Sequence, residues 1–396
     1  MIYAFDLCMN LRGWAMPVNA DAQKLSILHV LTLNGRNGEY GGPVRVAQEL
    51  CAELNSRGHN THIFSGAREG SEPTPKPGLA ESWILVKSIS RRFAVSSLWS
   101  WHLIKPLNKL IKSADVVHIH FARDLISYIS AFLAILKKKA FVTQTHGMII
   151  SDGRVSTRII DFFFTKPLIN RSSMNLVLTE IEMSSIRTLK IKSPAKILPN
   201  GIAINSSRKL RDSFSKRVVF CSRLDKRKGI DKFINLADSF RESDLVFEIY
   251  GPDGGELKLV KSEIEKKKIS KTLKYNGALS SSEVQKMLEV VDLLILPSKD
   301  EPFPMVILES LAVGTQVLVM PSCGFANQLR DFEAAFVAES EDQNGIFNSF
   351  QKFFESGFQL KSREAIREFC RDKFGISSVT DQLVRNYKEA LFNARS

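Results

Sequence analysis

The stretch from Leu293 to Leu311 reads LLILPSKDEPFPMVILESL. Its first four residues are apolar and Pro297 and Ser298 follow them, a pattern typical of a short buried strand in a parallel sheet. Apolar residues then recur at helical spacing, which predicts a helix; they are Phe303, Val306, Ile307 and Leu311. Glu301 therefore falls in the loop at the carboxyl end of a strand, and Glu309 lies about two turns into the helix. In isolation the two glutamates would be interpreted as solvated surface acids, but ligands bind at such strand ends in open parallel sheets.

A glycine-rich loop opens the first half of the chain. Ser26–Leu33 predicts a buried strand, Asn34–Gly42 (NGRNGEYGG) a loop, and Pro43 suits the first turn of a helix. The glycine spacing is not GxGxxG, no acid ends the next strand, and no Gly-Lys-Ser/Thr follows, which excludes a dinucleotide fingerprint and a P-loop. What remains is a loop at a helix N-terminus where Gly42 lets a phosphate or a sugar approach the backbone.

Further loops at predicted strand ends follow along the chain. The candidate ligand-binding residues that they carry are His146, Asn200, Arg223, Lys228 and Gly251. His118 and His120 are candidate metal ligands, but two histidines without a third ligand nearby are more often ordinary residues at the end of a strand. The polar stretch 205–215 divides two series of alternating strands and helices, and is interpreted as an interdomain linker.

Length and composition indicate a soluble protein of two globular domains. The chain has 396 residues, of which 44% are hydrophobic and 24% charged. Its 5 cysteines are scattered without a CxxC pair, which argues against a disulfide framework or a zinc site and for a reducing compartment. No apolar run reaches the roughly 18 to 20 residues of a membrane span, and the first residues lack a signal-peptide pattern. We therefore expect a cytoplasmic protein.

Positive charge is concentrated in the first half. Residues 1–205 carry 25 Lys and Arg against 14 Asp and Glu, a net charge of +11, and they contain all 4 tryptophans. Aromatic and basic residues alternate between Trp83 and Lys112, as in segments that lie on an anionic membrane surface; the alternative is an amphipathic helix packed on its own sheet. The predicted membrane-surface residues are Arg91, Arg92, Trp99, Trp101 and Lys105. Nucleic acid is not an expected partner, because no recognition module is present.

This order of loops resembles the retaining, nucleotide-sugar-dependent glycosyltransferases with two Rossmann-like domains, the GT-B fold of glycosyltransferase family 4. The resemblance extends over about residues 26–390. It implies an α/β fold with an N-terminal acceptor-binding domain at 25–204 and a nucleotide-sugar-binding domain at 205–375, facing a central cleft. It also implies a C-terminal helix within 376–396 that packs back toward the first domain.

The resemblance assigns roles to the candidate residues. Arg223 and Lys228 hold the donor diphosphate, Glu309 holds its ribose, and Glu301 and His146 contact the transferred sugar as the catalytic pair. Gly42, Asn200, Gly251, Met305 and Val306 complete the donor site. No cofactor or metal is expected beyond the nucleotide-diphosphate sugar itself, because the chain lacks the Asp-x-Asp of metal-dependent glycosyltransferases.

The predicted function is transfer of a hexosyl group to a lipid-linked or oligosaccharide acceptor on the cytoplasmic membrane face, in bacterial surface polysaccharide or lipopolysaccharide biosynthesis. The alternatives are a nucleotide-sugar epimerase or a soluble-acceptor synthase of the same fold, and a non-catalytic nucleotide-sugar or nucleic-acid binder. Pro302 and Pro304 depart from the family pattern, since Pro304 has no N–H to donate. Ala203 and Ser222 also replace the usual acid and glycine.

Overall fold

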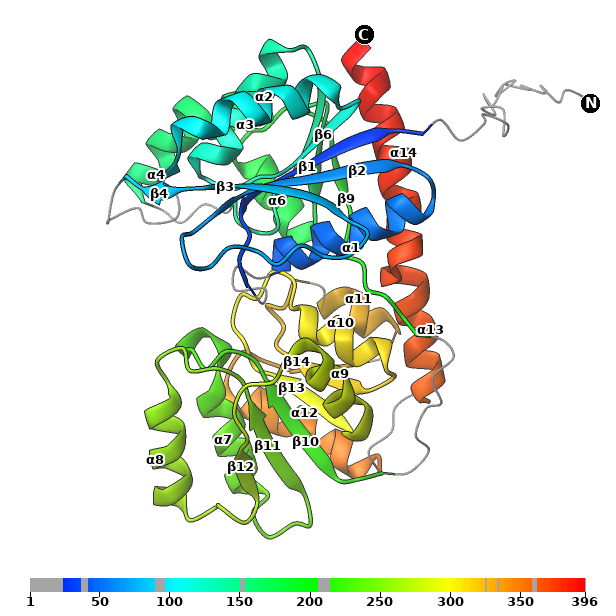
Figure 1. The fold of residues 1–396 in the computed structure, drawn as a ribbon. Coiled ribbons are helices and arrows are strands. Elements are labelled where there is room, and N and C mark those ends of the chain that lie inside the picture. The colour runs from blue at the N-terminus through cyan, green and yellow to red at the C-terminus, as the bar shows by residue number, and fades with distance from the viewer. Residues whose placement is uncertain are drawn as a thin grey trace, which may run out of the picture.

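The computed structural model describes residues 24–36, 42–89, 97–149, 154–205, 214–324, 326–332, 335–357 and 362–395. Two α/β halves lie one above the other, and the C-terminal helix runs beside both (Figure 1). Arg91 and Arg92, which were predicted to contact a membrane, lie outside the described residues.

The first half is built on a parallel seven-stranded sheet in the order β3-β2-β1-β6-β7-β8-β9. Its strands are β1 Ser26–Leu33, β2 Asn60–Ala67, β3 Ala80–Leu85, β6 Val116–His120, β7 Ala140–Gln144, β8 Met174–Val177 and β9 Ala195–Ile197. The helices are α1 Gly42–Ser56, η3 Trp101–Leu103, α2 Ile104–Ser113, α3 Leu125–Leu136, α4 Val155–Ile160, the π-helix η4 Asp161–Thr165, α5 Lys166–Ile169 and α6 Glu180–Thr188. A small antiparallel pair, β4 Lys87–Ser88 and β5 Leu98–Trp99, lies beside them.

The second half repeats this design with a parallel six-stranded sheet in the order β12-β11-β10-β13-β14-β15. Its strands are β10 Arg217–Cys221, β11 Val246–Tyr250, β12 Leu273–Tyr275, β13 Leu293–Leu296, β14 Gln316–Val319 and β15 Ala335–Val337. The helices are η5 Lys226–Lys228, α7 Ile230–Ser239, α8 Leu257–Lys267, α9 Ser281–Val290, α10 Met305–Ala312, α11 Ala326–Phe332, α12 Gln343–Glu355 and α13 Arg363–Phe374. The strand and the helix predicted from the opening stretch are β13 and α10, and β13 is wholly buried as the apolar run requires.

The last helix, α14 (Ile376–Arg395), continues from α13 and lies against α1 and β7 of the first half. Val379, Leu383 and Tyr387 recur every fourth residue and are fully buried in a cluster shared with β1, α1 and β6. The Ile202 amide donates to the Phe374 carbonyl at 2.8 Å, and the Ile376 amide donates to the Ile202 carbonyl at 2.9 Å. These hydrogen bonds join the segment that leads into the second half, at Ile202, to the segment that leads out of it, between α13 and α14.

The described parts of the aromatic and basic segment, 83–89 and 97–112, form several short elements instead of one long amphipathic helix. Trp83 lies in the edge strand β3 opposite Ser65 of β2, and Trp99 lies in β5. No residue of β3 is fully buried, so its sequence lacks the apolar run that reveals the central strands. Within the described residues, no helix is long and apolar enough to cross a membrane.

Candidate active site

An ion pair joins Lys228 and Glu301 at the carboxyl ends of the second sheet's strands. The Lys228 Nζ lies 2.5 Å from the Glu301 Oε2, and both side chains are largely buried. Gly229 follows Lys228 with a φ of 68°, and a Cβ there would collide with the Pro297 carbonyl just after β13. Only glycine therefore lets the β10–α7 loop approach the β13–α10 loop closely enough to form the pair.

Arg223 and Gly251 follow β10 and β11, so they lie at the same carboxyl edge of the second sheet. The Arg223 side chain is 66% exposed and its Nε donates to Asp225 at 3.1 Å. Gly251 has a φ of 149°, and a Cβ there would collide with the Ser222 carbonyl. An exposed guanidinium next to a glycine backbone is suited to binding a phosphate from solvent.

Glu309 of α10 forms an ion pair with Arg45 of α1, which belongs to the other half. The same guanidinium donates to Glu49 at 2.8 Å. Burial opposes the charge of Arg45, but Glu309 and Glu49 outweigh it and raise the arginine's pKa. Gly42 is the first residue of α1, and a Cβ added to it would meet nothing within 4 Å. The helix that begins at the glycine loop thus reaches the predicted ribose carboxylate through Arg45.

The loop after β7 presents His146 to the second half. His146 is half-buried and has a φ of 48°, a left-handed conformation that is uncommon for a residue other than glycine. Next to it, a Cβ on Gly147 would lie 2.6 Å from the Cβ of Pro302. The loop that carries His146 therefore touches the loop that carries Glu301, although 155 residues separate the two side chains in sequence.

Glu182 accepts hydrogen bonds from the loop that carries His146. Its Oε1 accepts from the Thr145 hydroxyl and from the Gly147 amide at 2.6 Å, and its Oε2 accepts from the Leu178 amide at 2.7 Å. Burial raises the pKa of this carboxyl. The Thr179 hydroxyl caps the helix that follows by accepting from the Glu182 amide at 3.2 Å, while the Glu182 carboxylate binds the His146 loop.

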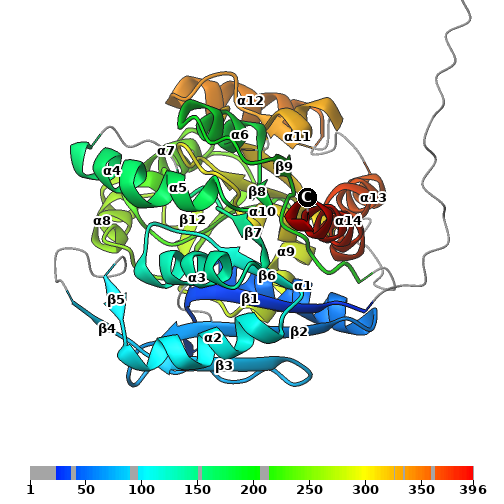
Figure 2. The same ribbon diagram turned by 90° about the horizontal axis from the view of Figure 1, so that it is seen from above.

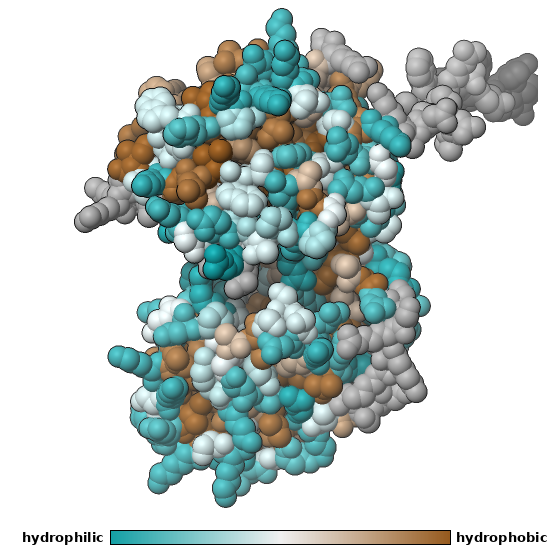
Figure 3. Space-filling view, viewed as in Figure 1, coloured by the Kyte–Doolittle hydropathy of each residue, from teal (hydrophilic) through white to brown (hydrophobic). Residues whose placement is uncertain are grey.

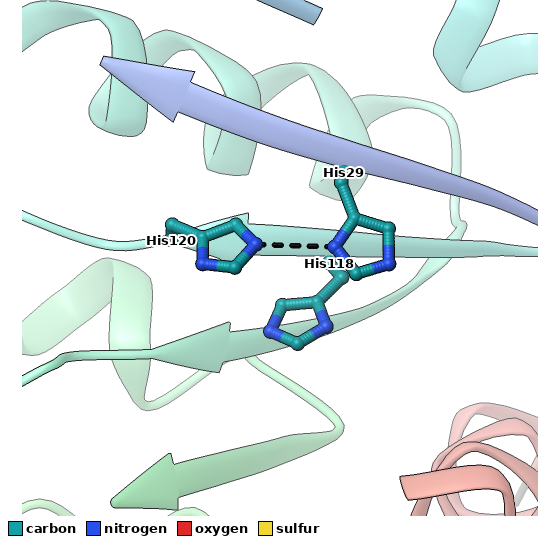
Figure 4. Close-up of side chains that lie close together, drawn as sticks. All are labelled: His29, His118 and His120. Carbon is teal, nitrogen blue, oxygen red and sulfur yellow. Dashed lines mark hydrogen bonds between the residues drawn. The ribbon is translucent and has the colours of Figure 1, made fainter. Parts of the chain in front are cut away.

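A buried chain of hydrogen-bonded rings lies behind His146. The His146 Nε2 is 2.7 Å from the His120 Nδ1, and the His120 Nε2 is 3.1 Å from the His29 Nδ1 (Figure 4). The Tyr387 hydroxyl of α14 lies 3.4 Å from the His29 Nε2 and 2.6 Å from the His118 Nδ1. Burial lowers the pKa of His29 and of His146 to about 3, and lowers those of His118 and His120 well below their usual range. All four imidazoles are therefore neutral at physiological pH.

His29, His118 and His120 also form the one group of possible metal ligands within the part of the chain that the structure describes. Both ring nitrogens of His29 and both of His120 already lie within hydrogen-bonding distance of another ring or of the tyrosine hydroxyl. Coordination would require those contacts to break, and no carboxylate belongs to the group. The arrangement fits a hydrogen-bonded network better than a metal site.

A cavity of about 320 Å³ opens on the first half beside His120. It is lined by Leu31, Thr32, Leu33, Pro43, Val44, His120, Ala122, Arg123, Asp124 and Met148. These residues come from the carboxyl ends of β1 and β6, from the start of α1 and from the His146 loop, which is the ligand side of the first sheet.

Comparison with known proteins assigns the fold to a family. The family model for Glycosyltransferase Family 4 matches residues 40–206, and the model for Glycosyl transferases group 1 matches residues 204–373. The chain belongs to the family 4 (group 1) glycosyltransferases. Its two facing α/β halves are the Rossmann-like domains of the GT-B fold.

This glycosyltransferase has a relative in Klebsiella pneumoniae, described as an uncharacterized 41.2 kDa protein in the cps region. The two are 24% identical over 309 residues, which cover 74% of this chain and 84% of that protein. The alpha-monoglucosyldiacylglycerol synthase of Streptococcus pneumoniae is 24% identical over 189 residues, which cover 43% of each chain. Among solved structures, Anabaena HepE in complex with UDP is similar with a TM-score of 0.72 at 14% identity, over 91% of this chain and 99% of that one.

The fold brings together most of the residues that the sequence singled out in this glycosyltransferase. Lys228 contacts Glu301, and the His146 loop touches the Glu301 loop. The Asn200 amide lies 3.6 Å from the Met305 sulfur, and its buried Oδ1 has no partner within the described structure. Val306 follows Met305 in the first turn of α10, three residues before Glu309. Trp99, Trp101 and Lys105 lie apart from these residues, beside the first sheet.

Sequence reasoning missed three polar contributors, Arg45, Glu182 and Tyr387. Arg45 and Tyr387 act on residues 264 and 269 positions away, so no local pattern could reveal them. Glu182 contacts Gly147 across 35 positions, so a local pattern could not reveal its role either. His29 carried a usable signal, since it stands in the middle of a buried apolar strand where an unpaired polar side chain is costly.

Proposed function

We propose that this glycosyltransferase is a retaining enzyme that moves a hexosyl group from a nucleoside-diphosphate sugar to a lipid-linked glycan, as a peripheral protein on the cytoplasmic membrane face. The Lys228–Glu301 contact carries this proposal. In a diphosphate sugar the anomeric carbon is bonded directly to a phosphate oxygen, so a cation for the phosphate must stand next to a carboxylate for the sugar. The two side chains meet this requirement.

In the proposed reaction, the acceptor hydroxyl attacks the anomeric carbon on the face that the phosphate leaves. The bond between the anomeric carbon and the phosphate oxygen breaks, and the hydroxyl proton passes to that oxygen, giving the glycosylated acceptor and the nucleoside diphosphate. Lys228 and Arg223 stabilise the charge that develops on the diphosphate. Glu301 stabilises the positive charge on the sugar ring. His146 is neutral, since burial lowers its pKa to about 3, so it hydrogen-bonds a sugar hydroxyl without repelling that charge.

The relatives support the proposed substrates. Anabaena HepE binds UDP, and the Streptococcus relative is a synthase of a glucosylated diacylglycerol by its name. The Klebsiella relative belongs to a cps region. We infer a nucleotide-sugar donor, a lipid-linked or oligosaccharide acceptor, no nucleic acid, and a place in surface polysaccharide or lipopolysaccharide biosynthesis. Because Lys228 and Arg223 supply the positive charge, we further propose that no metal ion or other cofactor takes part.

The test combines donor binding with product analysis. A thermal-shift screen of UDP, GDP, ADP and their hexoses should find a ligand that raises the melting temperature. Incubation of that donor with a lipid-linked acceptor should give a product with the donor's anomeric configuration, at a rate that a chelator leaves unchanged. An inverted product would refute retention, and conversion of the donor without an acceptor would indicate an epimerase. A chain that binds no nucleotide sugar would refute the whole proposal.

A further inference from the structure

The helical stretch formed by α4, η4 and α5 buries polar side chains and exposes apolar ones, which is the reverse of the usual amphipathic helix of a soluble protein. Before the buried Ile169 at its end, its buried residues are polar: Thr157, Asp161 and Thr165 are 8%, 7% and 1% exposed. Its exposed residues are apolar: Val155, Ile159, Phe162, Phe163 and Phe164 are between 53% and 69% exposed. Helices of soluble proteins turn their apolar face toward the core. A contiguous exposed apolar face of this kind marks a surface that meets a partner or a membrane.

Specific polar contacts fix this orientation of the helix. The Arg123 Nε and Nη2 donate to the two oxygens of Asp161 at 2.8 and 2.9 Å. The Tyr128 hydroxyl of α3 lies 2.9 Å from the Thr165 hydroxyl. Turning the apolar face inward would break the bidentate ion pair and leave both charges poorly solvated, which costs several kcal/mol. The helix is thus held with its phenylalanines in solvent.

The charges around the apolar face favour an anionic partner. The stretch 154–171 contains Arg154, Arg158, Lys166 and Arg171, and its one acid, Asp161, is buried and paired. Figure 3 shows hydrophobic residues gathered on the upper left of the molecule, where Figure 1 draws α4. Seen from above, α4 and the β4–β5 pair lie on the same side of the first half (Figure 2). That pair is followed by Trp101, which is 80% exposed.

Arg123 connects this face to the cavity beside His120. Besides pairing with Asp161, Arg123 donates to the Met148 carbonyl at 2.9 Å, and both Arg123 and Met148 line the cavity beside His120. A lipid-linked acceptor in a membrane that contacts the phenylalanines would therefore have its glycan headgroup near the cavity and the His146 loop.

We propose that Val155, Ile159, Phe162 and Phe163 insert into the leaflet of an anionic bilayer that faces the protein. This contact would place the cavity beside His120, as the acceptor site, at the membrane surface. The occupant is the lipid surface itself. The inference deepens the proposed function, since it gives a lipid-linked acceptor its route, but binding to vesicles requires neither a donor nor catalysis.

The experiment measures co-sedimentation of the full chain with vesicles of phosphatidylcholine containing about 30% phosphatidylglycerol. Replacement of both aromatic side chains, Phe162→Ser with Phe163→Ser, should reduce partitioning at least tenfold. Leu259→Ser, on the exposed surface of α8 in the other half, is the matched control and should leave partitioning unchanged. Arg158→Glu should weaken binding to anionic vesicles and leave the weaker binding to pure phosphatidylcholine unchanged.

Three outcomes separate the alternatives. Equal vesicle binding by the double variant and the wild type would overturn the proposal. A wild-type dimer in sedimentation velocity that the double variant dissociates would show that a second copy covers the face instead. If transfer to a detergent-soluble acceptor is absent while vesicle binding behaves as expected, the proposed function fails and the docking surface stands.

Tyr387 lies at the far end of the ring chain from His146, and its hydroxyl proton decides the direction of every hydrogen bond between them. The hydroxyl has one proton for two neighbouring histidines, and we assign it to the shorter contact, which is 2.6 Å to the His118 Nδ1 against 3.4 Å to the His29 Nε2. The His29 Nε2–H then donates to the tyrosine oxygen. Each neutral imidazole carries one N–H, so the His120 Nε2–H donates to His29 and the His146 Nε2–H donates to His120.

The geometry therefore points to Tyr387 as a positioning residue that keeps the His146 Nδ1 unprotonated, as an acceptor for a substrate hydroxyl. This second inference rests on an observation separate from the docking surface, and it makes the C-terminal helix part of the site's chemistry. The predicted effect on activity rests on the proposed function. The predicted tautomer of His146 does not, because it is a property of the protein without substrate.

Nitrogen-15 NMR of the histidines in the full chain tests this assignment. The wild type should show a pyridine-like Nδ1 and a pyrrole-like Nε2 at His146. Tyr387→Phe should average the two shifts, and should lower kcat several-fold with the donor KM little changed. Leu383→Ala destabilises the same helix without touching the chain, so it should leave the shifts as in the wild type. A pyrrole-like Nδ1 in the wild type, or unchanged shifts in Tyr387→Phe, would overturn the inference whatever the activity.

Discussion

Arg45 of α1 in the first half and Glu309 of α10 in the second half form an ion pair between the two halves of the molecule. If Glu309 binds the ribose hydroxyls, the carboxylate must exchange this arginine for the nucleotide. The pair is then a resting contact of the ligand-free enzyme.

Donor binding should therefore respond differently to the two partners. Glu309→Ala should weaken binding of the nucleoside diphosphate about tenfold to hundredfold, because the ribose loses a charge-assisted hydrogen bond. Arg45→Ala should leave the affinity unchanged or raise it, since no cation competes for the carboxylate. Isothermal titration calorimetry on both variants checks this. An equal loss in both would mean that the ribose needs the intact ion pair.

The Lys228–Glu301 pair predicts a separation of binding from catalysis. Lys228→Met should weaken nucleoside diphosphate binding about tenfold or more, because a partly buried cation for the phosphates is lost. Glu301→Gln should keep that affinity, since it frees Lys228, yet lower kcat by about a hundredfold. Lys226→Met, in the same short helix, serves as the control for general charge. A Glu301→Gln variant with weakened diphosphate binding and a normal kcat would contradict the assigned roles.

The sequence was sufficient for the residues whose position depends on one strand and its following loop. Lys228, Glu301 and His146 were placed correctly on the ligand side because parallel strands carry their loops to one edge. It was insufficient for α4 and η4. Thr157, Asp161 and Thr165 share a helical face with spacing of four, as do Val155, Ile159 and Phe163, and periodicity alone does not tell which face is buried. The face that is buried depends on Arg123, which lies in the loop between β6 and α3 and forms an ion pair with Asp161.

The buried histidines predict that acid destabilises the folded protein. Burial lowers the pKa of His29 from 6.5 to about 3, so between these values the unfolded chain binds a proton that the folded chain excludes. The free energy of unfolding therefore falls as the pH falls below about 6.5, by up to about 1.4 kcal/mol per pH unit for this one side chain. His118 and His120 act in the same direction.

Urea denaturation at pH 7.5, 6.5 and 5.5 measures this dependence. Replacing His118 by Gln removes one of the buried imidazoles, and the slope of stability against pH should become shallower even if the variant is less stable at every pH. His102→Gln removes an exposed histidine next to Trp101 and should leave the slope as in the wild type. Identical slopes in all three proteins would show that the buried imidazoles take up protons in the folded state.

Glu182 should be as important for turnover as the residues that touch the substrate. Its carboxylate accepts from the Thr145 hydroxyl and the amides of Gly147 and Leu178, so Glu182→Ala leaves three buried donors unpaired and should cost about 2 to 5 kcal/mol of stability. Glu182→Gln keeps the size of the side chain but offers only one acceptor oxygen, so it should fold and release the loop that positions His146. Its kcat should fall about tenfold or more while nucleoside diphosphate binding, measured by calorimetry, stays unchanged because Lys228 and Glu309 are untouched. A Glu182→Gln variant with wild-type kcat would show that the packing of the neighbouring Gly147 against Pro302 is enough to hold the left-handed conformation of His146.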